Sequence, residues 1–161
     1  MFTVGFHVAL LGVFFDDQPY SSIQLSIGLY FVVLTIFHFS EFLITAINQH
    51  SVTTEAFLLN HSREYHLALT ISLIEFAIES YFAPEVKFYF PLLIKIGFGI
   101  CLICESIRKV AMCTAGQNFT HIIADEHQPE HFLVTTGIYG IWRHPSYVGW
   151  FYWSIGTQVS H

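Results

Sequence analysis

Charged residues are scarce in this chain of 161 residues. They make up 11% of the sequence, while 53% of the residues are hydrophobic; a soluble globular protein has about 25% charged residues. The shortage is greatest among the bases, with six Lys and Arg against twelve Asp and Glu. The chain therefore has no basic patch of the kind that binds nucleic acid. This composition excludes an ordinary soluble domain and indicates an integral membrane protein.

Cysteine is also rare. Cys101, Cys104 and Cys113 are the three in the chain, so no disulfide framework is implied. Cys101 and Cys104 form a C-x-x-C pair, which in a soluble βαβ setting would suggest redox chemistry. Here both thiols fall inside an apolar segment, where formation of the thiolate is unfavourable. We interpret them as packing residues.

Long apolar runs are what the chain does contain. A helix needs about 20 such residues to cross a bilayer, and only helices or closed barrels satisfy their backbone groups there. We predict a short, marginal span at 2–15, full spans at 22–47, 65–82 and 88–107, and the start of another at 147–160. The predicted fold is all-α: a polytopic integral membrane helical bundle with a cytosolic cofactor-binding loop.

The runs divide the chain into three parts. Residues 1–113 form a transmembrane region of about four spans, residues 114–146 a polar loop, and residues 147–161 the beginning of a further span that the end of the chain cuts short. A second polar loop, at 48–64, is expected to contain a short helical piece at Thr54–Leu59.

The basic residues orient the bundle. If the spans alternate, four of the six fall on one side of the membrane: Arg63, Arg108, Lys109 and Arg143. Basic residues concentrate in cytosolic loops. We therefore expect both polar loops in the cytosol.

Several ionisable residues interrupt the apolar runs: His38, Glu41, Glu75, Glu79, Lys95 and Glu105. A charge at the centre of a bilayer costs about 2.5 to 3.5 kcal/mol on insertion scales. Such residues either line a polar route or substrate cavity, or hold helices together through hydrogen bonds. We favour the second interpretation, with Glu41 or Glu75 bonded to a neighbouring hydroxyl or imidazole, because no second helix offers an obvious arginine-rich partner.

Four histidines, His121, His127, His131 and His144, lie in the 114–146 loop. Their spacing matches no compact ligand pattern such as H-E-x-x-H. We predict no metal site and expect the imidazoles to form hydrogen bonds with a polar ligand.

The segment Arg143–Tyr147 stands directly before the last apolar run. Pro145 fixes its own φ and restricts His144 to an extended conformation, so the imidazole points just ahead of a helix that we expect to start at Ser146. The amide groups at such a helix start favour an anionic group. A ligand carboxylate would be stabilised there.

Aromatic and apolar residues surround this turn. Tyr139 and Tyr147 could form flat walls that also donate hydrogen bonds, and His131–Val134 could lie as an apolar edge against an adenine or similar ring. A plain helix cap with an aromatic cluster at the membrane interface would use the same residues. Residue chemistry alone supports the two interpretations equally.

These strings resemble the isoprenylcysteine carboxyl methyltransferase family. The segments that carry the resemblance are His38–Phe42, Phe57–Ser62, Thr114–Phe119, His131–Val134, Gly137–Gly149 and Trp150–Gln158. An isolated Arg-His-Pro-x-Tyr is shared with phospholipid methyltransferases and sterol reductases, but the Trp-rich continuation is not. We therefore rank a sterol reductase relative below a methyltransferase.

The resemblance implies an endoplasmic reticulum membrane enzyme. It would transfer a methyl group from S-adenosylmethionine to the α-carboxylate of the prenylated C-terminal cysteine of proteins processed at C-a-a-X ends. Its implied partners are these prenylated proteins and the lipid bilayer. The cofactor-binding residues it implies are His131, Phe132, Leu133, Val134, Tyr139, His144, Pro145, Ser146 and Tyr147.

The catalytic residues are not identified by the resemblance. In the family, the arginine and glutamate that hold the acceptor carboxylate follow the last spans, and this chain ends at His161. We expect the chain to lack part of the catalytic region, and Arg143 is not assigned the missing role. The alternative is a catalytically silent membrane isoform or partner that binds prenylated tails or cofactor only.

Overall fold

The computed structural model describes residues 19–49, 52–60, 62–83, 91–121 and 132–160. Within these ranges the chain forms helices and connecting turns and contains no strand, so the all-α prediction is confirmed. The expected span at 2–15 lies outside the described residues.

Four α-helices account for most of the described chain: α2 (Pro19–Asn48), α3 (Arg63–Phe82), α5 (Pro91–Ala115) and α6 (Pro145–Ser160). Three short 3-10 helices lie between them: η1 (Thr54–Phe57), η2 (Gly116–Asn118) and η3 (Gly137–Gly140). The predicted spans at 22–47 and 65–82 coincide with α2 and α3. The helical piece expected at Thr54–Leu59 is η1.

Helix α5 is longer than its apolar run. The sequence places the end of the predicted span at Arg108 and Lys109, but the helix continues to Ala115. Ala111, Met112 and Ala115 in these extra turns favour a helix and are buried. Both basic side chains turn inward and pair with carboxylates of the bundle.

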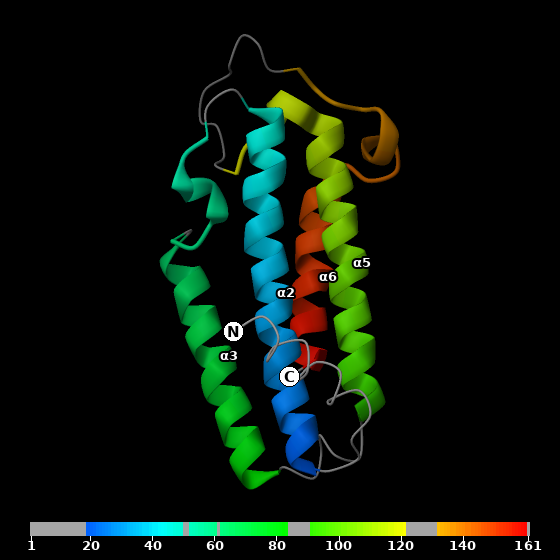
Figure 1. The fold of residues 1–161 in the computed structure, drawn as a ribbon. Coiled ribbons are helices and arrows are strands. Elements are labelled where there is room, and N and C mark those ends of the chain that lie inside the picture. The colour runs from blue at the N-terminus through cyan, green and yellow to red at the C-terminus, as the bar shows by residue number, and fades with distance from the viewer. Residues whose placement is uncertain (1–18, 50–51, 61, 84–90, 122–131, 161) are drawn as a thin grey trace, which may run out of the picture.

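Helices α2, α5 and α6 form the packed part of the molecule, with α5 and α6 side by side (Figure 1). Helix α3 stands to one side of α2, and the buried residue among its side chains is Ser72. Its outer positions carry Leu67, Ile71 and Ile78, all more than half exposed.

Close contact between α5 and α6 depends on glycine. A Cβ atom on Gly149 of α6 would lie 2.7 Å from the Cys104 carbonyl oxygen of α5, and one on Gly97 of α5 would lie 2.6 Å from the Ser160 nitrogen of α6. Cys101 and Cys104 are free thiols buried at this interface. Their interpretation as packing residues agrees with this position.

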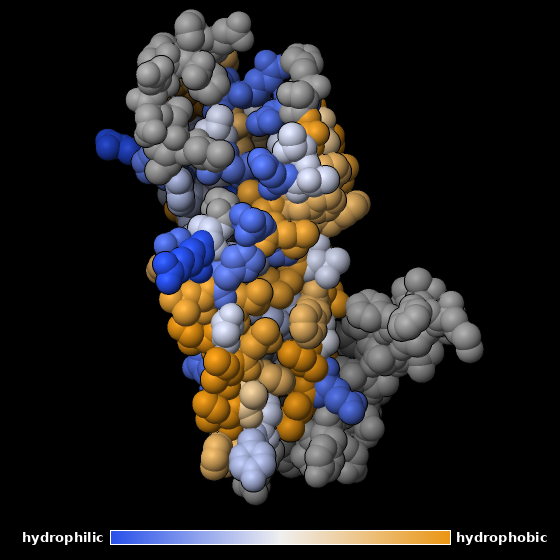
Figure 2. Space-filling model, turned by 90° about the vertical axis from the view of Figure 1, so that its left-hand side faces the viewer, coloured by the Kyte–Doolittle hydropathy of each residue, from blue (hydrophilic) through white to orange (hydrophobic). Residues whose placement is uncertain are grey.

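One helix among the described residues, α2, is long and apolar enough by length and composition to cross a membrane, over Ile23–Asn48. On the face that carries α3, hydrophobic side chains cover the lower part, and hydrophilic ones gather toward the end with the polar loops (Figure 2). The bundle therefore has an apolar body with a polar end.

Candidate functional site

A cavity of about 510 Å³ lies at the polar end of the bundle. All four α-helices contribute to its wall, together with residues of the connecting segments. The lining residues are Phe37, Leu58, Ser62, Glu64, Tyr65, Ala68, Arg108, Phe119, Thr120, His121, Tyr139, His144, Pro145, Ser146, Tyr147 and Trp150. The wall thus combines aromatic rings with hydroxyl, imidazole and charged groups.

Five predicted cofactor-binding residues line this cavity together: Tyr139, His144, Pro145, Ser146 and Tyr147. The other described ones do not. Phe132 and Leu133 are 70% and 87% exposed, and Val134 is half-buried. His131 lies outside the described residues. The amide of Phe132 donates a hydrogen bond of 3.0 Å to Asn118 Oδ1, which attaches the start of this segment to η2.

The turn before α6 has the geometry that its proline dictates. Pro145 is the first residue of α6, the position at which a missing amide hydrogen costs nothing. The amide of Val148 donates to the His144 carbonyl at 3.1 Å and starts the hydrogen-bond ladder of the helix. The rings of His144 and Tyr147 meet edge to face, with centroids 6.3 Å apart.

Tyr139 reaches the cavity through a turn that requires glycine. Gly137 has φ +58°, and a Cβ atom there would lie 3.1 Å from Thr114 Cγ2. Burial raises the pKa of Tyr139, against the opposing effect of the Arg108 charge. The phenol hydroxyl therefore remains a hydrogen-bond donor at neutral pH.

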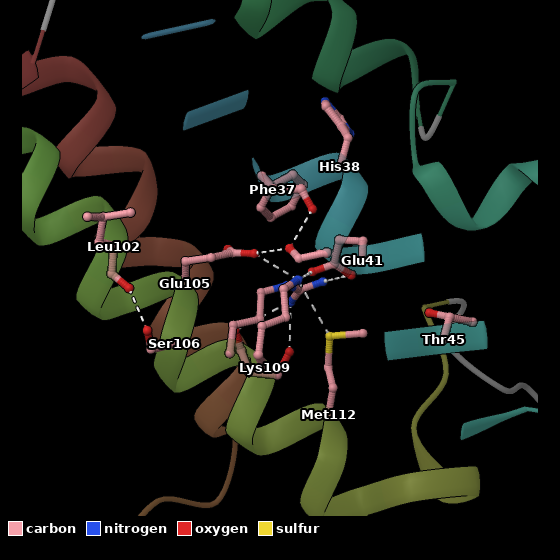
Figure 3. Close-up of polar contacts among 12 residues, drawn as sticks. Phe37, His38, Glu41, Thr45, Leu102, Glu105, Ser106, Lys109 and Met112 are labelled. Carbon is pink, nitrogen blue, oxygen red and sulfur yellow. Dashed lines mark hydrogen bonds and ion pairs between the residues drawn. The ribbon is translucent and has the colours of Figure 1, made fainter. Parts of the chain in front are cut away.

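Directly behind the cavity wall lies a buried ion-pair network centred on Glu41 of α2. Arg108 donates from Nε to Glu41 Oε1 at 2.5 Å and from Nη2 to Oε2 at 3.1 Å. Lys109 also contacts Glu41 Oε1, and His121 Nδ1 lies 3.5 Å from Oε2. Figure 3 shows Glu41, Glu105 and Lys109 pointing toward one another between α2 and α5.

This network corrects the interpretation of the intramembrane acids. A hydroxyl or imidazole was expected to be the main partner of Glu41, and an arginine partner was judged absent. That expectation was wrong, because Arg108 belongs to the same helix as the apolar run and faces inward. Glu105 is paired within the network as well, with Lys109 Nζ at 2.9 Å and the Ser40 hydroxyl at 2.5 Å. Glu75 and Glu79 are exposed on α3.

Arg108 connects the network to the cavity. Its Nη1 donates to Ser146 Oγ at 2.7 Å and to the Ser146 carbonyl oxygen at 3.4 Å. Sequence analysis did not identify Arg108 as a site residue. The sequence did contain a signal for this role: two adjacent basic residues, Arg108 and Lys109, at the end of an apolar run, and two acidic residues, Glu41 and Glu105, within apolar runs that could pair with them.

A second cavity of about 350 Å³ lies between α2, α3 and α6 and shares Tyr65, Ala68 and Trp150 with the first. Its lining is mostly apolar, including Leu34, Leu69, Trp153, Ile155 and Val159. The two cavities therefore adjoin, and the larger one is lined by the charged and imidazole side chains of Glu64, Arg108, His121 and His144.

Tyr65 is held at the border between the cavities by His38. The Nδ1 atom of His38 lies 2.7 Å from the Phe57 carbonyl oxygen, so this nitrogen carries the hydrogen. Its Nε2 atom is then the acceptor for the Tyr65 hydroxyl at 2.8 Å.

No group of three or more His, Cys, Asp or Glu side chains suited to a metal occurs within the described ranges.

Comparisons with known proteins give a consistent result. The sequence profile of the Isoprenylcysteine carboxyl methyltransferase (ICMT) family matches residues 96–160. The protein-S-isoprenylcysteine O-methyltransferases of Tribolium castaneum and Xenopus laevis are each 46% identical to this chain, over 94% and 99% of it. That of Homo sapiens is 50% identical over 82% of the chain.

A solved structure, described as the eukaryotic intramembrane Ras methyltransferase, superimposes with a TM-score of 0.82 at 44% identity and covers 96% of this chain. The helical membrane fold predicted from the sequence agrees with this match. The chain spans about half the length of these relatives: 54% and 57% of the insect and frog proteins, 46% of the human one and 56% of the solved structure.

Proposed function

Because this chain belongs to the isoprenylcysteine carboxyl methyltransferase family, we propose that it serves the S-adenosylmethionine-dependent methylation of prenylcysteine α-carboxylates. The acceptors are the C-terminal cysteines of proteins processed at C-a-a-X ends. The observation that carries the proposal is the cavity of about 510 Å³, which brings Tyr139 and His144–Tyr147 together.

The cavity suits the methyl donor in size and chemistry. Its volume of about 510 Å³ falls in the range of about 300 to 1,000 Å³ typical of small-molecule sites. Aromatic rings of Phe119, Tyr139 and Trp150 offer flat surfaces for a nucleobase, and the start of α6 offers amide groups to a carboxylate. S-adenosylmethionine presents both kinds of group.

We assign Tyr139, His144, Pro145, Ser146 and Tyr147 to donor binding, together with the His131–Val134 segment that the family resemblance supplies. When bound, S-adenosylmethionine supplies an electrophilic methyl group beside a good leaving group. The Tyr139 hydroxyl and the His144 imidazole fix orientation through hydrogen bonds. The rings of Tyr147 and Trp150 exclude water from the donor.

The reaction asks little acid–base chemistry of this chain, because a carboxylate is already a nucleophile at neutral pH. Orientation of the two reactants and exclusion of water dominate the rate enhancement. We assign none of the described residues to the acceptor carboxylate. Arg108 lines the cavity, but its charge is already paired with that of Glu41. It is therefore not assigned to the acceptor carboxylate.

The apolar cavity next to Tyr65 supports a place for the prenyl chain. It is about 350 Å³ in volume and lies between α3 and α6, on the side where α3 packs loosely. We propose that the prenyl chain enters there sideways from the bilayer, so that its cysteine reaches the border with the larger cavity. The burial of its CH₂ groups would supply about 0.8 kcal/mol each.

We further propose a multi-pass placement in the endoplasmic reticulum membrane, with the 114–146 segment and the donor cavity facing the cytosol. Arg63 and Arg143 are exposed, and their sequence neighbours Glu64 and His144 line the cavity. Basic residues of this kind are typical of cytosolic loops. Epitope accessibility at the 52–60 loop in selectively permeabilised cells would test the orientation.

One experiment tests donor binding and turnover side by side. The 161-residue chain in lipid nanodiscs is titrated with labelled S-adenosylmethionine, and methylation of a farnesylcysteine analogue is measured in parallel. We expect saturable donor binding with at most trace turnover. Absence of donor binding by a folded chain would reject the proposal. Robust turnover would instead show that the described segment is sufficient for catalysis.

A further inference from the structure

Arg108 belongs to the buried network and also contacts Ser146, one of the residues proposed to bind the donor. It joins Glu41 of α2 through two nitrogens and Ser146 of α6 through a third. Its own position is on α5, so a single guanidinium fixes three helices relative to one another. Its side chain is 10% exposed.

The contact falls at the point where α6 begins. Ser146 follows Pro145, the first residue of the helix, and both are buried in the cavity wall. His144, two positions before Ser146, and Tyr147, directly after it, line the cavity. A shift of the Ser146 hydroxyl would therefore move the start of α6 and both of those side chains.

The planar fork of arginine is what makes this arrangement possible. Its nitrogens point in fixed directions and can serve a carboxylate on one edge and a hydroxyl on the other. A lysine at the same position has a single ammonium on a flexible stem. It would keep the charge beside Glu41 but could not hold both partners in this geometry.

Lys109 provides a built-in comparison. It pairs with Glu41 and Glu105 in the same network, and its side chain is 14% exposed. Unlike Arg108, it is absent from the lining of the cavity. The effect of exchanging one buried base for another can therefore be separated from loss of the connection to Ser146.

We propose that Arg108 is a positioning residue for methyl-donor binding: held by Glu41, it fixes Ser146 and thereby sets the first turn of α6. This inference rests on the proposed function, because it gives Arg108 a role in the same site. It does not make Arg108 a catalytic residue. The guanidinium acts through Ser146.

The test compares Arg108→Lys with Lys109→Arg in the full chain in nanodiscs. The dissociation constant for labelled S-adenosylmethionine and the midpoint of thermal unfolding are measured for each variant, at a temperature where all are folded. We expect Arg108→Lys to raise the dissociation constant about tenfold or more, since small displacements at a binding site are costly. Lys109→Arg should leave it within about twofold of the wild type.

Ser146→Ala then tests the route of the effect. If Arg108 acts through Ser146, the double variant Arg108→Lys, Ser146→Ala should bind the donor no more weakly than Arg108→Lys alone, because coupled residues are not additive. Full additivity of the two effects on the dissociation constant would overturn the inference. So would an unchanged dissociation constant in Arg108→Lys.

Hydrogen exchange gives a reading that does not depend on the donor. The Val148 amide donates to the His144 carbonyl at the start of α6, and we expect Arg108→Lys to exchange this hydrogen faster than Lys109→Arg does. If the wild type binds no donor, the proposed function fails while this comparison still tests the positioning. Equal exchange in the two variants would overturn it.

Discussion

Glu41 of α2 and Arg108 of α5, separated by 67 positions in the chain, form a two-point ion pair inside the bundle. The Glu41 side chain is fully buried. Two charges removed from water are costly unless their geometry and further hydrogen bonds compensate for the loss. Lys109 supplies a further contact to Glu41, and Ser146 supplies one to Arg108.

Glu41→Gln should therefore destabilise the fold strongly. The amide keeps the shape of the side chain but leaves Arg108 and Lys109 with one buried carboxylate, Glu105, between them. We expect a loss of about 3 kcal/mol or more in the free energy of unfolding, measured by denaturant titration in detergent micelles. Glu75→Gln is the control, because Glu75 is exposed on α3. Equal losses in the two variants would contradict the role given to the network.

The close approach of α5 and α6 leads to a second prediction. In Gly149→Ala the new methyl group would lie 2.7 Å from the Cys104 carbonyl oxygen, so the helices must separate. Overpacking of this kind costs about 1 to 3 kcal/mol. In Gly99→Ala, a helix position with nothing within 4 Å of the added Cβ, the change should stabilise the fold by about 0.4 to 1 kcal/mol. The midpoint of thermal unfolding is measured for both variants. A shift of the midpoint in the same direction in both would refute the packing argument.

A third prediction concerns Tyr65, at the border between the two cavities. Tyr65→Phe removes the hydroxyl that donates to His38 Nε2, at a cost of about 1 kcal/mol in stability for an unsatisfied acceptor. The freed ring can then move into either cavity, so the apparent constant for a farnesylcysteine analogue should rise. Tyr81→Phe removes a hydroxyl from a residue that is 80% exposed. It should change neither quantity.

Filling the apolar cavity tests the proposed prenyl site. Leu69 lines that cavity, and Leu67, on the same helix, is 60% exposed. Leu69→Trp should raise the apparent constant for the farnesylcysteine analogue without changing the affinity for S-adenosylmethionine, while Leu67→Trp should change neither. An unaltered constant in Leu69→Trp would count against sideways entry between α3 and α6.

Local pattern was enough to predict the helices and one turn. The apolar runs at 22–47 and 65–82 became α2 and α3, and α6 begins at Pro145, one residue before the expected Ser146. The residues gathered around that turn, Tyr139 and Ser146 among them, do line one cavity. In these cases neighbours along the chain determine the structure.

What the sequence could not reveal was the pairing between helices. Glu41, Glu75 and Glu79 look alike in an apolar run, yet the structure buries Glu41 and exposes the other two. The difference depends on how α2 and α5 are rotated and shifted along their axes relative to each other, and a short sequence pattern does not contain that information. The end of α5 was misplaced because the apolar run stops at Arg108, whereas the helix continues through residues that pack inside the bundle, such as Ala111 and Met112.

The alkaline limit of stability gives a final prediction, because burial raises the pKa of Tyr139 above its ordinary value of 10.0. In the unfolded chain this phenol loses its proton first as the pH rises. The folded state then binds more protons than the unfolded state, so stability falls with increasing pH. The contribution of Tyr139 is fully present below about pH 10 and is lost as the pH rises through the folded-state pKa. Tyr139→Phe should therefore lose less stability than the wild type between pH 9 and pH 11, as measured by the unfolding midpoint in the same detergent. Identical slopes for the two proteins would show that the Tyr139 hydroxyl is not held in its protonated form by the cavity wall.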